Sequence, residues 1–203
     1  SLKTVVITGG TSIDSHAFYY CSSLTSVTIL DRVTSIGHSA FYGCSSLTSM
    51  TLPFVGASVD GTSNTHFGYI FGASRYEWRD FFGCLHTQSE CVPSSLKTVV
   101  IMGGVSIDSH AFYSCGSLTS ITIPNSVTSI CDYAFDDCSG LTSITIPDSV
   151  MNFGDSVFEG CSSLTSITFN GTIAQWDTIS KGYNWNSSTG SYTVHCTDGD
   201  IQK

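Results

Sequence analysis

The sequence predicts a β-rich, right-handed solenoid with one large insertion and a C-terminal cap. Two observations lead to this prediction. Nearly the same seven residues recur, as LTSVTIL, LTSMTLP, LTSITIP twice and LTSITFN, and Cys115, Cys138 and Cys161 mark a step of 23 residues between later copies. Residues 54–93 interrupt the pattern. A regular repeat of this length is typical of a stacked scaffold, in which each unit packs on the next.

Each repeat contains the signals of two short strands and a turn. Its consensus is L-T-S-I-T-I-P-x-S-V-T-S-I-G-x-x-A-F-x-x-C-x-S. Alternation in L-T-S-I-T-I predicts a half-buried strand, which Pro124 or Pro147 ends because proline has no N–H to donate. V-T-S-I predicts a second extended run, and G-x-x-A-F-x-x-C then turns the chain and directs Phe and Cys inward. The repeats begin at Leu2, Leu24, Leu47, Leu96, Leu118, Leu141 and Leu164.

This repeat resembles a known family. Its L-x-x-I-x-I core matches the leucine-rich-repeat template, although Ser126 and Ser149 occupy the slot in which that template has Asn or Cys. With the pattern LTSITIPxSVTSIGxxAFxxC, residues 1–53 and 94–170 resemble the BspA-type leucine-rich repeats of bacterial and protozoan surface proteins. The resemblance implies a right-handed leucine-rich-repeat stack and adhesion to host matrix or cell-surface proteins.

The chain divides at the edges of the repeat pattern. Leucine-rich repeats occupy 1–53 and 94–169, the aromatic-rich insertion occupies 54–93, and a C-terminal cap occupies 170–203. The two repeat blocks are also related to each other, because 24 of the 29 residues in 1–29 match those 94 positions later. Since residues 54–94 precede the second block, we expect a similar segment before Ser1 in a longer parent chain.

The insertion is too long for an ordinary loop, and its many aromatic residues argue against disorder. Alternation over residues 66–71 predicts a strand. Two interpretations remain open: an elaborated repeat that packs on its neighbours, or a protrusion that contacts a ligand, since loops on a rigid scaffold often carry recognition. The candidate ligand-contacting residues of the insertion are His66, Tyr69, Phe71, Tyr76 and Trp78.

The C-terminal region has its own pattern. Thr172 is expected to cap a short helix that places Ile173, Trp176 and Ile179 on one face. Residues 192–196 predict a final strand, and Asp198-Gly199 predicts a turn. We interpret the region as the polar-backed cap that a solenoid end needs. The alternative is a sugar-stacking platform of aromatic residues, namely Trp176, Tyr183 and Trp185.

Five of the nine cysteines occupy one slot of the repeat. We interpret them as a structural cysteine ladder of buried thiols that fill space beside phenylalanine, while disulfides between stacked neighbours remain an alternative. Cys84 and Cys91 are a second possible pair, within the insertion. No C-x-x-C is present, so we predict no zinc site and no other metal or cofactor. The cysteine ladder consists of Cys21, Cys44, Cys115, Cys138 and Cys161.

Asp14-Ser15-His16 and Asp108-Ser109-His110 have the letters of a hydrolase triad, but a triad is an arrangement in space and not three adjacent residues. Other repeats place Gly, Cys, Asp or Tyr in these slots. We therefore interpret the slots as turn positions and predict no catalytic residues.

A row of threonines is predicted to point outward from the first strand of successive repeats. With a second row of threonines three residues earlier, it is expected to form a flat, hydroxyl-rich face. This face is either a consequence of strand propensity or a docking surface for a protein or a glycan. Its candidate contact residues are Thr28, Thr122, Thr145 and Thr168, with Thr51 in the same slot.

Composition and charge limit the classes of function that the sequence predicts. A net charge of −9 argues against nucleic-acid binding, and no apolar run reaches the roughly 18 residues of a membrane span. We predict a non-enzymatic binding or adhesion module of a secreted or cell-surface protein. Host matrix or cell-surface proteins are the expected partners, basic ones being favoured by charge. The alternatives are a carbohydrate-binding module and a passive spacer of a larger exported protein.

Overall fold

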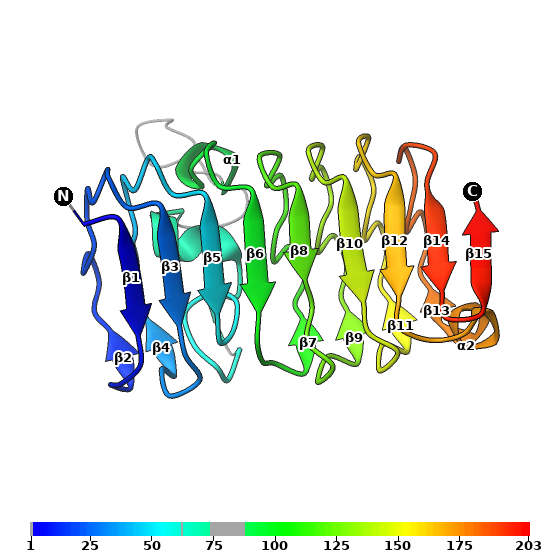
Figure 1. The fold of residues 1–203 in the computed structure, drawn as a ribbon, viewed down its shortest axis with the longest axis horizontal. Helices are drawn as coiled ribbons and strands as arrows, with labels where there is room; N and C mark the ends of the chain where they lie inside the picture. Colours follow the sequence, from blue (N-terminus) through cyan, green and yellow to red (C-terminus); the bar gives the residue numbers. More distant parts are fainter. Residues whose placement is uncertain (1, 62, 74–87) are drawn as a thin grey trace.

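The computed structural model describes residues 2–61, 63–73 and 88–203. It is a parallel β-solenoid, in which the first strands of successive repeats lie side by side along the length of the molecule (Figure 1). The N-terminus lies at one end of the stack and the C-terminus at the other. The predicted leucine-rich-repeat solenoid is thereby confirmed.

In the described part of the chain, the main sheet has nine strands in the order β1-β3-β5-β6-β8-β10-β12-β14-β15. All neighbours are parallel except the last pair, which is an antiparallel hairpin. The register joins identical slots, so that Thr28 pairs with Thr51 and Thr122 with Thr145. The strands are β1 (Thr4–Ile7), β3 (Ser26–Ile29), β5 (Ser49–Leu52), β6 (Thr98–Ile101), β8 (Ser120–Thr122), β10 (Ser143–Ile146), β12 (Ser166–Phe169), β14 (Thr193–Cys196) and β15 (Gly199–Gln202).

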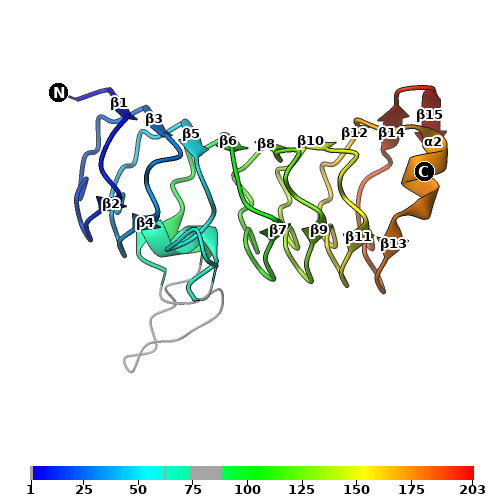
Figure 2. The same ribbon diagram turned by 90° about the horizontal axis from the view of Figure 1, so that it is seen from below.

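The V-T-S-I runs form shorter strands on a second side of the solenoid, below the main sheet in Figure 2. This second side is divided into two sheets, one of two strands and one of four. The division falls at the insertion, although β5 and β6 pair directly across it in the main sheet. The short strands are β2 (Ser12–Ile13) and β4 (Ser35–Ile36), then β7 (Ser106–Ile107), β9 (Ser129–Ile130), β11 (Asn152–Phe153) and β13 (Ser180–Lys181).

A column of phenylalanine rings runs through the core. Phe112, Phe135 and Phe158 are fully buried and stack with ring centroids 5.4 Å apart. In the first block Phe18 stacks on Phe41 at 5.1 Å. Each ring needs a neighbour in the next repeat, so the column shows directly why one repeat cannot bury its apolar side alone.

The insertion continues this column. Residues 66–71 do not form the predicted strand; Phe67–Phe71 is instead the 3₁₀ helix η1. The physical reason is its position, because it fills the turn slot of the repeat: the Phe41 N–H donates to the Ile70 carbonyl, and the Phe67 N–H to the Ala111 carbonyl. The Phe71 ring faces Phe41, and the Phe67 ring lies 5.1 Å from Phe112.

One polar side chain joins the insertion to the second block. Gln88 opens the short helix α1 (Gln88–Cys91) and is completely buried. Its Oε1 accepts from the Gly68 N–H at 2.8 Å, and its Nε2 donates to the His110 carbonyl at 2.9 Å. A buried amide is tolerated when its groups are satisfied, and here those bonds connect η1, α1 and the next repeat.

The cysteine ladder is buried as predicted, except that Cys21 is half-buried at the open end. The thiols of Cys138 and Cys161 donate to the phenylalanine carbonyls of the preceding repeat, at 3.0 and 3.1 Å. All cysteines in the described part of the chain are free thiols, Cys91 among them. Cys84 lies outside the described residues.

The predicted cap is present. Helix α2 (Ile173–Thr178) begins at Thr172, whose side chain forms a capping box with Gln175. The C-terminal hairpin of β14 and β15 then completes the main sheet. Trp176 is buried against Phe153 and Phe169, so it is not available as part of a sugar-stacking platform.

The Asp-Ser-His slots are turn positions, as predicted. His16 and His110 have φ values of 62° and 59°, in the left-handed region that is uncommon for residues other than glycine. Ser39, Tyr133 and Ser156 occupy the same slot with φ between 53° and 59°. The recurrence shows that this slot belongs to the geometry of the repeat.

Replacing Gln88 with methionine tests the anchor of the insertion. Gln88→Met keeps the side-chain volume but leaves the buried Gly68 N–H without its acceptor, so we expect the free energy of unfolding to fall by about 1–3 kcal/mol. Urea denaturation followed by circular dichroism measures it. The control is Gln202→Met on the exposed sheet face, which is expected to change it by less than about 0.5 kcal/mol; equal effects of the two variants would contradict the anchoring role.

Because the cysteine ladder is buried, we expect the free energy of unfolding to fall at alkaline pH. Burial raises the pKa of the Cys44 thiol to about 11 and that of Cys161 to about 12. The folded state therefore holds protons that the unfolded chain releases near pH 9, so the stabilisation is complete below that pH and is lost as pH rises through 11 and 12. In reducing buffer, unfolding free energy between pH 8 and 10.5 should fall less steeply for Cys161→Ser than for the native chain. Parallel curves would disprove this.

Candidate functional site

The outward face of the main sheet carries the predicted threonine row. By register, Thr28, Thr122, Thr145 and Thr168 occupy one slot along the sheet. The row is not continuous, because β6 places Val100 in this slot, with 37% of its surface exposed. The face is therefore hydroxyl-rich with an apolar interruption near the insertion.

The earlier threonine row has a different role. The Thr48 hydroxyl donates to the Thr25 carbonyl at 3.0 Å, and Thr142 and Thr165 bond to the preceding repeat in the same way. These hydroxyls connect neighbouring repeats and are already engaged as donors. The outward hydroxyls that a ligand can contact are therefore mainly those in the other slot, which we call the Thr28 row. It consists of Thr28, Thr51, Thr122, Thr145 and Thr168.

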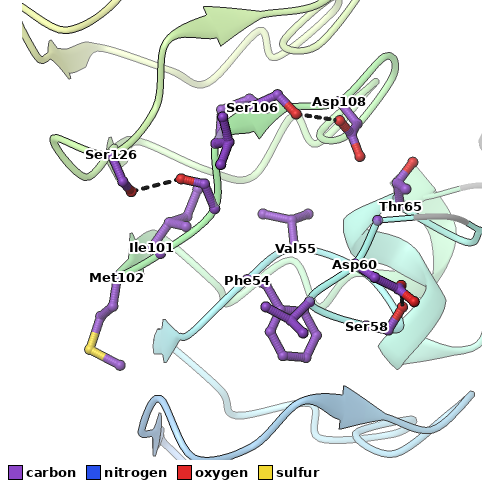
Figure 3. A pocket seen from close by; sticks show the side chains of 16 residues that line it. Phe54, Val55, Ser58, Asp60, Thr65, Ile101, Met102, Ser106, Asp108 and Ser126 are labelled. Carbon is purple, nitrogen blue, oxygen red and sulfur yellow. Dashed lines mark hydrogen bonds between the residues drawn. The ribbon is translucent and has the colours of Figure 1, made fainter.

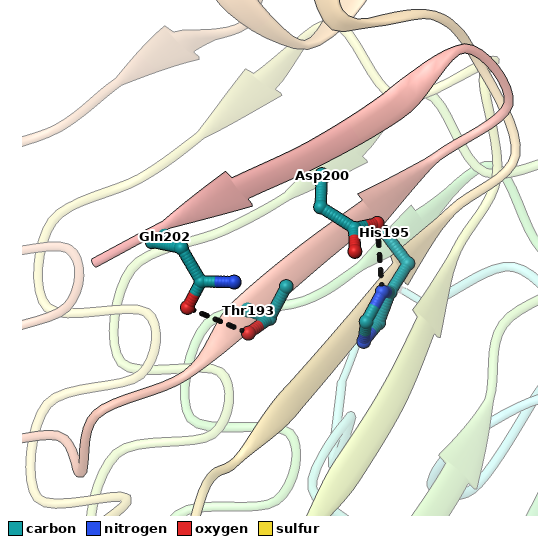
Figure 4. Close-up of polar contacts among 4 residues, drawn as sticks. All are labelled: Thr193, His195, Asp200 and Gln202. Atoms are coloured by element: carbon teal, nitrogen blue, oxygen red, sulfur yellow. Dashed lines mark hydrogen bonds and ion pairs between the residues drawn. The ribbon is translucent and has the colours of Figure 1, made fainter.

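The C-terminal end of the same face is polar and ionisable (Figure 4). His195 lies in the threonine slot of β14, and its Nδ1 is 2.9 Å from an Asp200 carboxylate oxygen on β15. The Thr193 hydroxyl donates to Gln202 at 3.0 Å. Both members of the His195–Asp200 pair are about half exposed, with 47% and 54% of their side-chain surfaces accessible, so the pair is a surface contact of small energy.

A pocket of about 590 Å³ lies where the second side of the solenoid is divided. Its walls come from the first part of the insertion and from β6, β7 and the connection between them (Figure 3). We call it the junction pocket. It is lined by Phe54, Val55, Ser58, Val59, Asp60, Gly61, Thr65, Ile101, Met102, Gly103, Gly104, Val105, Ser106, Ile107, Asp108 and Ser126.

The local sequence explains why the junction pocket forms at this position. After Pro53 the chain lacks the V-T-S-I run, and the described residues between β4 and β7 contain no short strand on the second side. Residues 57–59 instead run along β4 in the antiparallel sense: the Ile36 N–H donates to the Ala57 carbonyl, and the Val59 N–H to the Thr34 carbonyl. The β7 edge is left facing the pocket.

The junction pocket combines an apolar floor with an acidic rim. Phe54 is buried in its wall, whereas Val59 and Val105 are 56% and 69% exposed. Asp108 accepts a hydrogen bond from the Ser106 hydroxyl at 2.7 Å, and Asp60 accepts one from Ser58. No lysine, arginine or histidine occurs among the lining residues of this described pocket. The pocket therefore suits a group with an apolar stem and a positive charge.

Three of the predicted contact residues of the insertion, His66, Tyr69 and Phe71, do not line the junction pocket. His66 and Phe71 are buried, with 6% and 0% of their surfaces exposed, so their side chains serve packing. The His66 Nε2 is 3.2 Å from the Ala73 carbonyl, and burial lowers the pKa of His66. Tyr69 is partly exposed. Tyr76 and Trp78 lie outside the described residues.

The pocket residues were missed because each is ordinary by itself. Val105 and Asp108 are plain repeat positions, and Asp60 lies in a polar loop. The sequence feature that could have indicated the pocket is the missing V-T-S-I run after Pro53. A solenoid that lacks one short strand exposes the strand edges on either side of the gap.

Residues 2–61, 63–73 and 88–203 lack both a metal-binding cluster and a membrane-spanning helix. They contain no cluster of three or more His, Cys, Asp or Glu side chains arranged to hold a metal ion. No helix among them has the length and apolar content to cross a membrane.

Two solved structures that show similarity to this chain are described as leucine rich proteins. A leucine rich cell surface protein from Faecalibacterium prausnitzii is 26% identical over 89% of this chain, with a TM-score of 0.40. A leucine rich repeat protein from T. pallidum is 22% identical over 90% of this chain and 70% of its own, with a TM-score of 0.37. The chain spans 63% of the length of the first protein. A comparison with curated proteins found no match.

The repeat itself gives the decisive comparison. The model of the BspA type leucine rich repeat region matches residues 1–68 and 105–181 in six copies. These ranges cover more than half of the chain, and the gap between them contains most of the insertion. The chain belongs to the family of BspA-type leucine-rich-repeat proteins.

Proposed function

We propose that the chain is a non-enzymatic adhesion module of a secreted or cell-surface protein, which contacts host matrix or cell-surface proteins. The observation that carries the proposal is the junction pocket, with its apolar floor, its two carboxylates and no basic lining residue. The repeat family supports the coarser part, a protein-interaction or surface repeat module.

The chemistry of the pocket defines what it binds. A lysine or arginine of a partner protein places its aliphatic stem along Val55 and Val105, and its charged end near Asp60 and Asp108. A pocket that holds one such side chain acts as an anchor, while weaker contacts around it exclude water. The chain's net charge of −9 attracts basic surfaces at long range, in a salt-dependent way.

The threonine face supplies a second, weaker contact area. Its hydroxyls both donate and accept hydrogen bonds, and β6, which lies between Thr51 and Thr122 in this face, also contributes Ile101 to the pocket. A partner that places one basic side chain in the junction pocket therefore also reaches this part of the sheet. The same hydroxyls suit a glycan, so glycans belong in the binding test.

A closed-pocket variant tests which surface binds. Replacing residues 54–95 with a copy of 125–140 restores the 23-residue step between Leu47 and the next repeat and supplies the missing short strand. The second side then becomes continuous and the pocket is filled, while the threonine face remains. We expect this variant to lose saturable binding to an immobilised panel of matrix proteins, cell-surface proteins and glycans, with its β circular dichroism retained.

Two point variants separate the pocket from long-range charge. Asp108→Asn keeps the acceptor for Ser106 but removes one rim charge, and we expect it to raise the Kd by about tenfold and to weaken the salt dependence. Asp31→Asn, at an exposed turn residue outside the pocket and the threonine face, changes the net charge by the same amount and is the matched control. Equal losses for both variants would mean that only long-range charge matters.

The outcomes decide between the candidate functions. Undiminished binding by the closed-pocket variant overturns the pocket's role and assigns recognition to the sheet face or the cap. Binding only to glycans favours a carbohydrate-binding module. No binding by the native chain to any panel member overturns adhesion to these ligands and favours a passive spacer.

A further inference from the structure

Neighbouring short strands on the second side are joined by a recurring pair of backbone hydrogen bonds. Between β9 and β7, the Thr128 N–H donates to the Val105 carbonyl at 2.8 Å. The Cys131 N–H donates to the Ile107 carbonyl, also at 2.8 Å. The same two slots donate from β4 to β2 and from β11 to β9. Each of these short strands is thus held to the turn before it by two N–H groups at fixed positions.

On β7 the two corresponding N–H groups belong to Val105 and Asp108. Within the described ranges of the chain, neither of them donates to a backbone carbonyl. The facing edge of β4 differs, because residues 57–59 pair with it in the antiparallel sense. The β7 edge therefore borders the junction pocket with two donors that have no acceptor in the described chain.

The side chains along this edge specify what fits against it. Ile107 is buried, whereas Asp108 directly follows β7 and lines the junction pocket with Asp60 from the insertion (Figure 3). A strand in the register of the β7–β9 pair places one residue opposite Ile107 and the next opposite Asp108. Successive side chains of a strand point to opposite sides, so the first lies on the apolar floor and the second lies beside the carboxylate. An aliphatic residue followed by lysine or arginine satisfies both positions.

We propose that an extended segment of a basic partner protein adds to the second side as a parallel strand, paired with the β7 edge in the junction pocket. The N–H groups of Val105 and Asp108 donate to its carbonyls, and its lysine or arginine pairs with the Asp108 carboxylate. In strand addition of this kind, main-chain bonds give affinity and side-chain pockets give specificity. This inference rests on the proposed function and names how the pocket holds its partner.

Charge and size agree with this occupant. The pocket lining contains two carboxylates and no basic residue, which favours a basic segment over an acidic one. Its volume of about 590 Å³ lies within the roughly 300–1,000 Å³ of ligand sites.

Amide hydrogen exchange of the native chain, followed by NMR, tests the pairing. The probe is the peptide acetyl-SVTSIKG-amide, which copies the short-strand run and places lysine opposite Asp108. In the free chain we expect the Val105 and Asp108 amides to exchange fast, and those of Thr128 and Cys131, in the same slots one turn later, to exchange slowly. With the peptide at millimolar concentration, exchange of Val105 and Asp108 is expected to slow by about threefold or more.

Two further probes and one variant are the matched controls. Acetyl-SVTSIEG-amide places a carboxylate beside Asp108, and Nα-acetyl-lysine amide carries the positive charge without a strand. We expect neither to protect the two amides. Asp108→Asn keeps the backbone donor but removes the charge, so the difference between the lysine and glutamate peptides is expected to shrink.

The outcomes separate this inference from the proposed function. Slow exchange of Val105 and Asp108 in the free chain, no slowing with the lysine peptide, or equal protection by acetyl-lysine amide overturns the strand pairing. Equal protection by the lysine and glutamate peptides overturns the choice of a basic segment. The adhesion proposal is judged independently, by whether the closed-pocket variant loses binding to the panel.

Discussion

A repeat of this chain cannot bury its apolar side by itself, and the rest of the structure depends on that constraint. Each turn contributes one phenylalanine, one cysteine and a few aliphatic residues, and these become buried only when the next turn covers them. Stacking at the spacing of β-strands, about 4.8 Å, meets this need and pairs the backbone groups of neighbouring turns. Any segment inserted between two turns must therefore continue the stack or leave apolar surface exposed.

One part of the insertion continues the stack of turns, and another part interrupts the stack on the second side of the solenoid. Around η1, Phe67 and Phe71 continue the column, and Gln88 satisfies backbone groups on both sides. The described residues of 54–65 instead contribute no short strand to the second side of the solenoid, and the junction pocket lies at this position. The main sheet is continuous across the same position. A rigid scaffold and a local recessed surface thus arise from one change in the repeat.

The polar side chains also fall into two groups: one forms hydrogen bonds between neighbouring turns, and the other lies on the surface. The Thr25 row, the cysteine thiols and Gln88 bond to carbonyls or amides of neighbouring turns, so they stabilise the stack. The Thr28 row lies on the outward face of the main sheet, and Asp60 and Asp108 line the junction pocket. Membership of the BspA-type family agrees with a scaffold built from stacked turns of one repeat.

The sequence by itself determined the solenoid, the register of its strands, the buried cysteine ladder and the capped helix at Thr172, because each of these depends on a pattern repeated at a fixed step or on a local capping motif. It gave the wrong secondary structure for residues 66–71, since alternation predicts a strand only where a strand partner exists, and the turn slot offers none. Only the tertiary structure decided that His66 and Phe71 are buried. It also brought Asp60 together with Asp108, two residues far apart in the sequence, because the pocket depends on which strand is absent between β4 and β7. Contacts of that kind arise from neighbours in space, whereas the repeat pattern specifies neighbours along the stack.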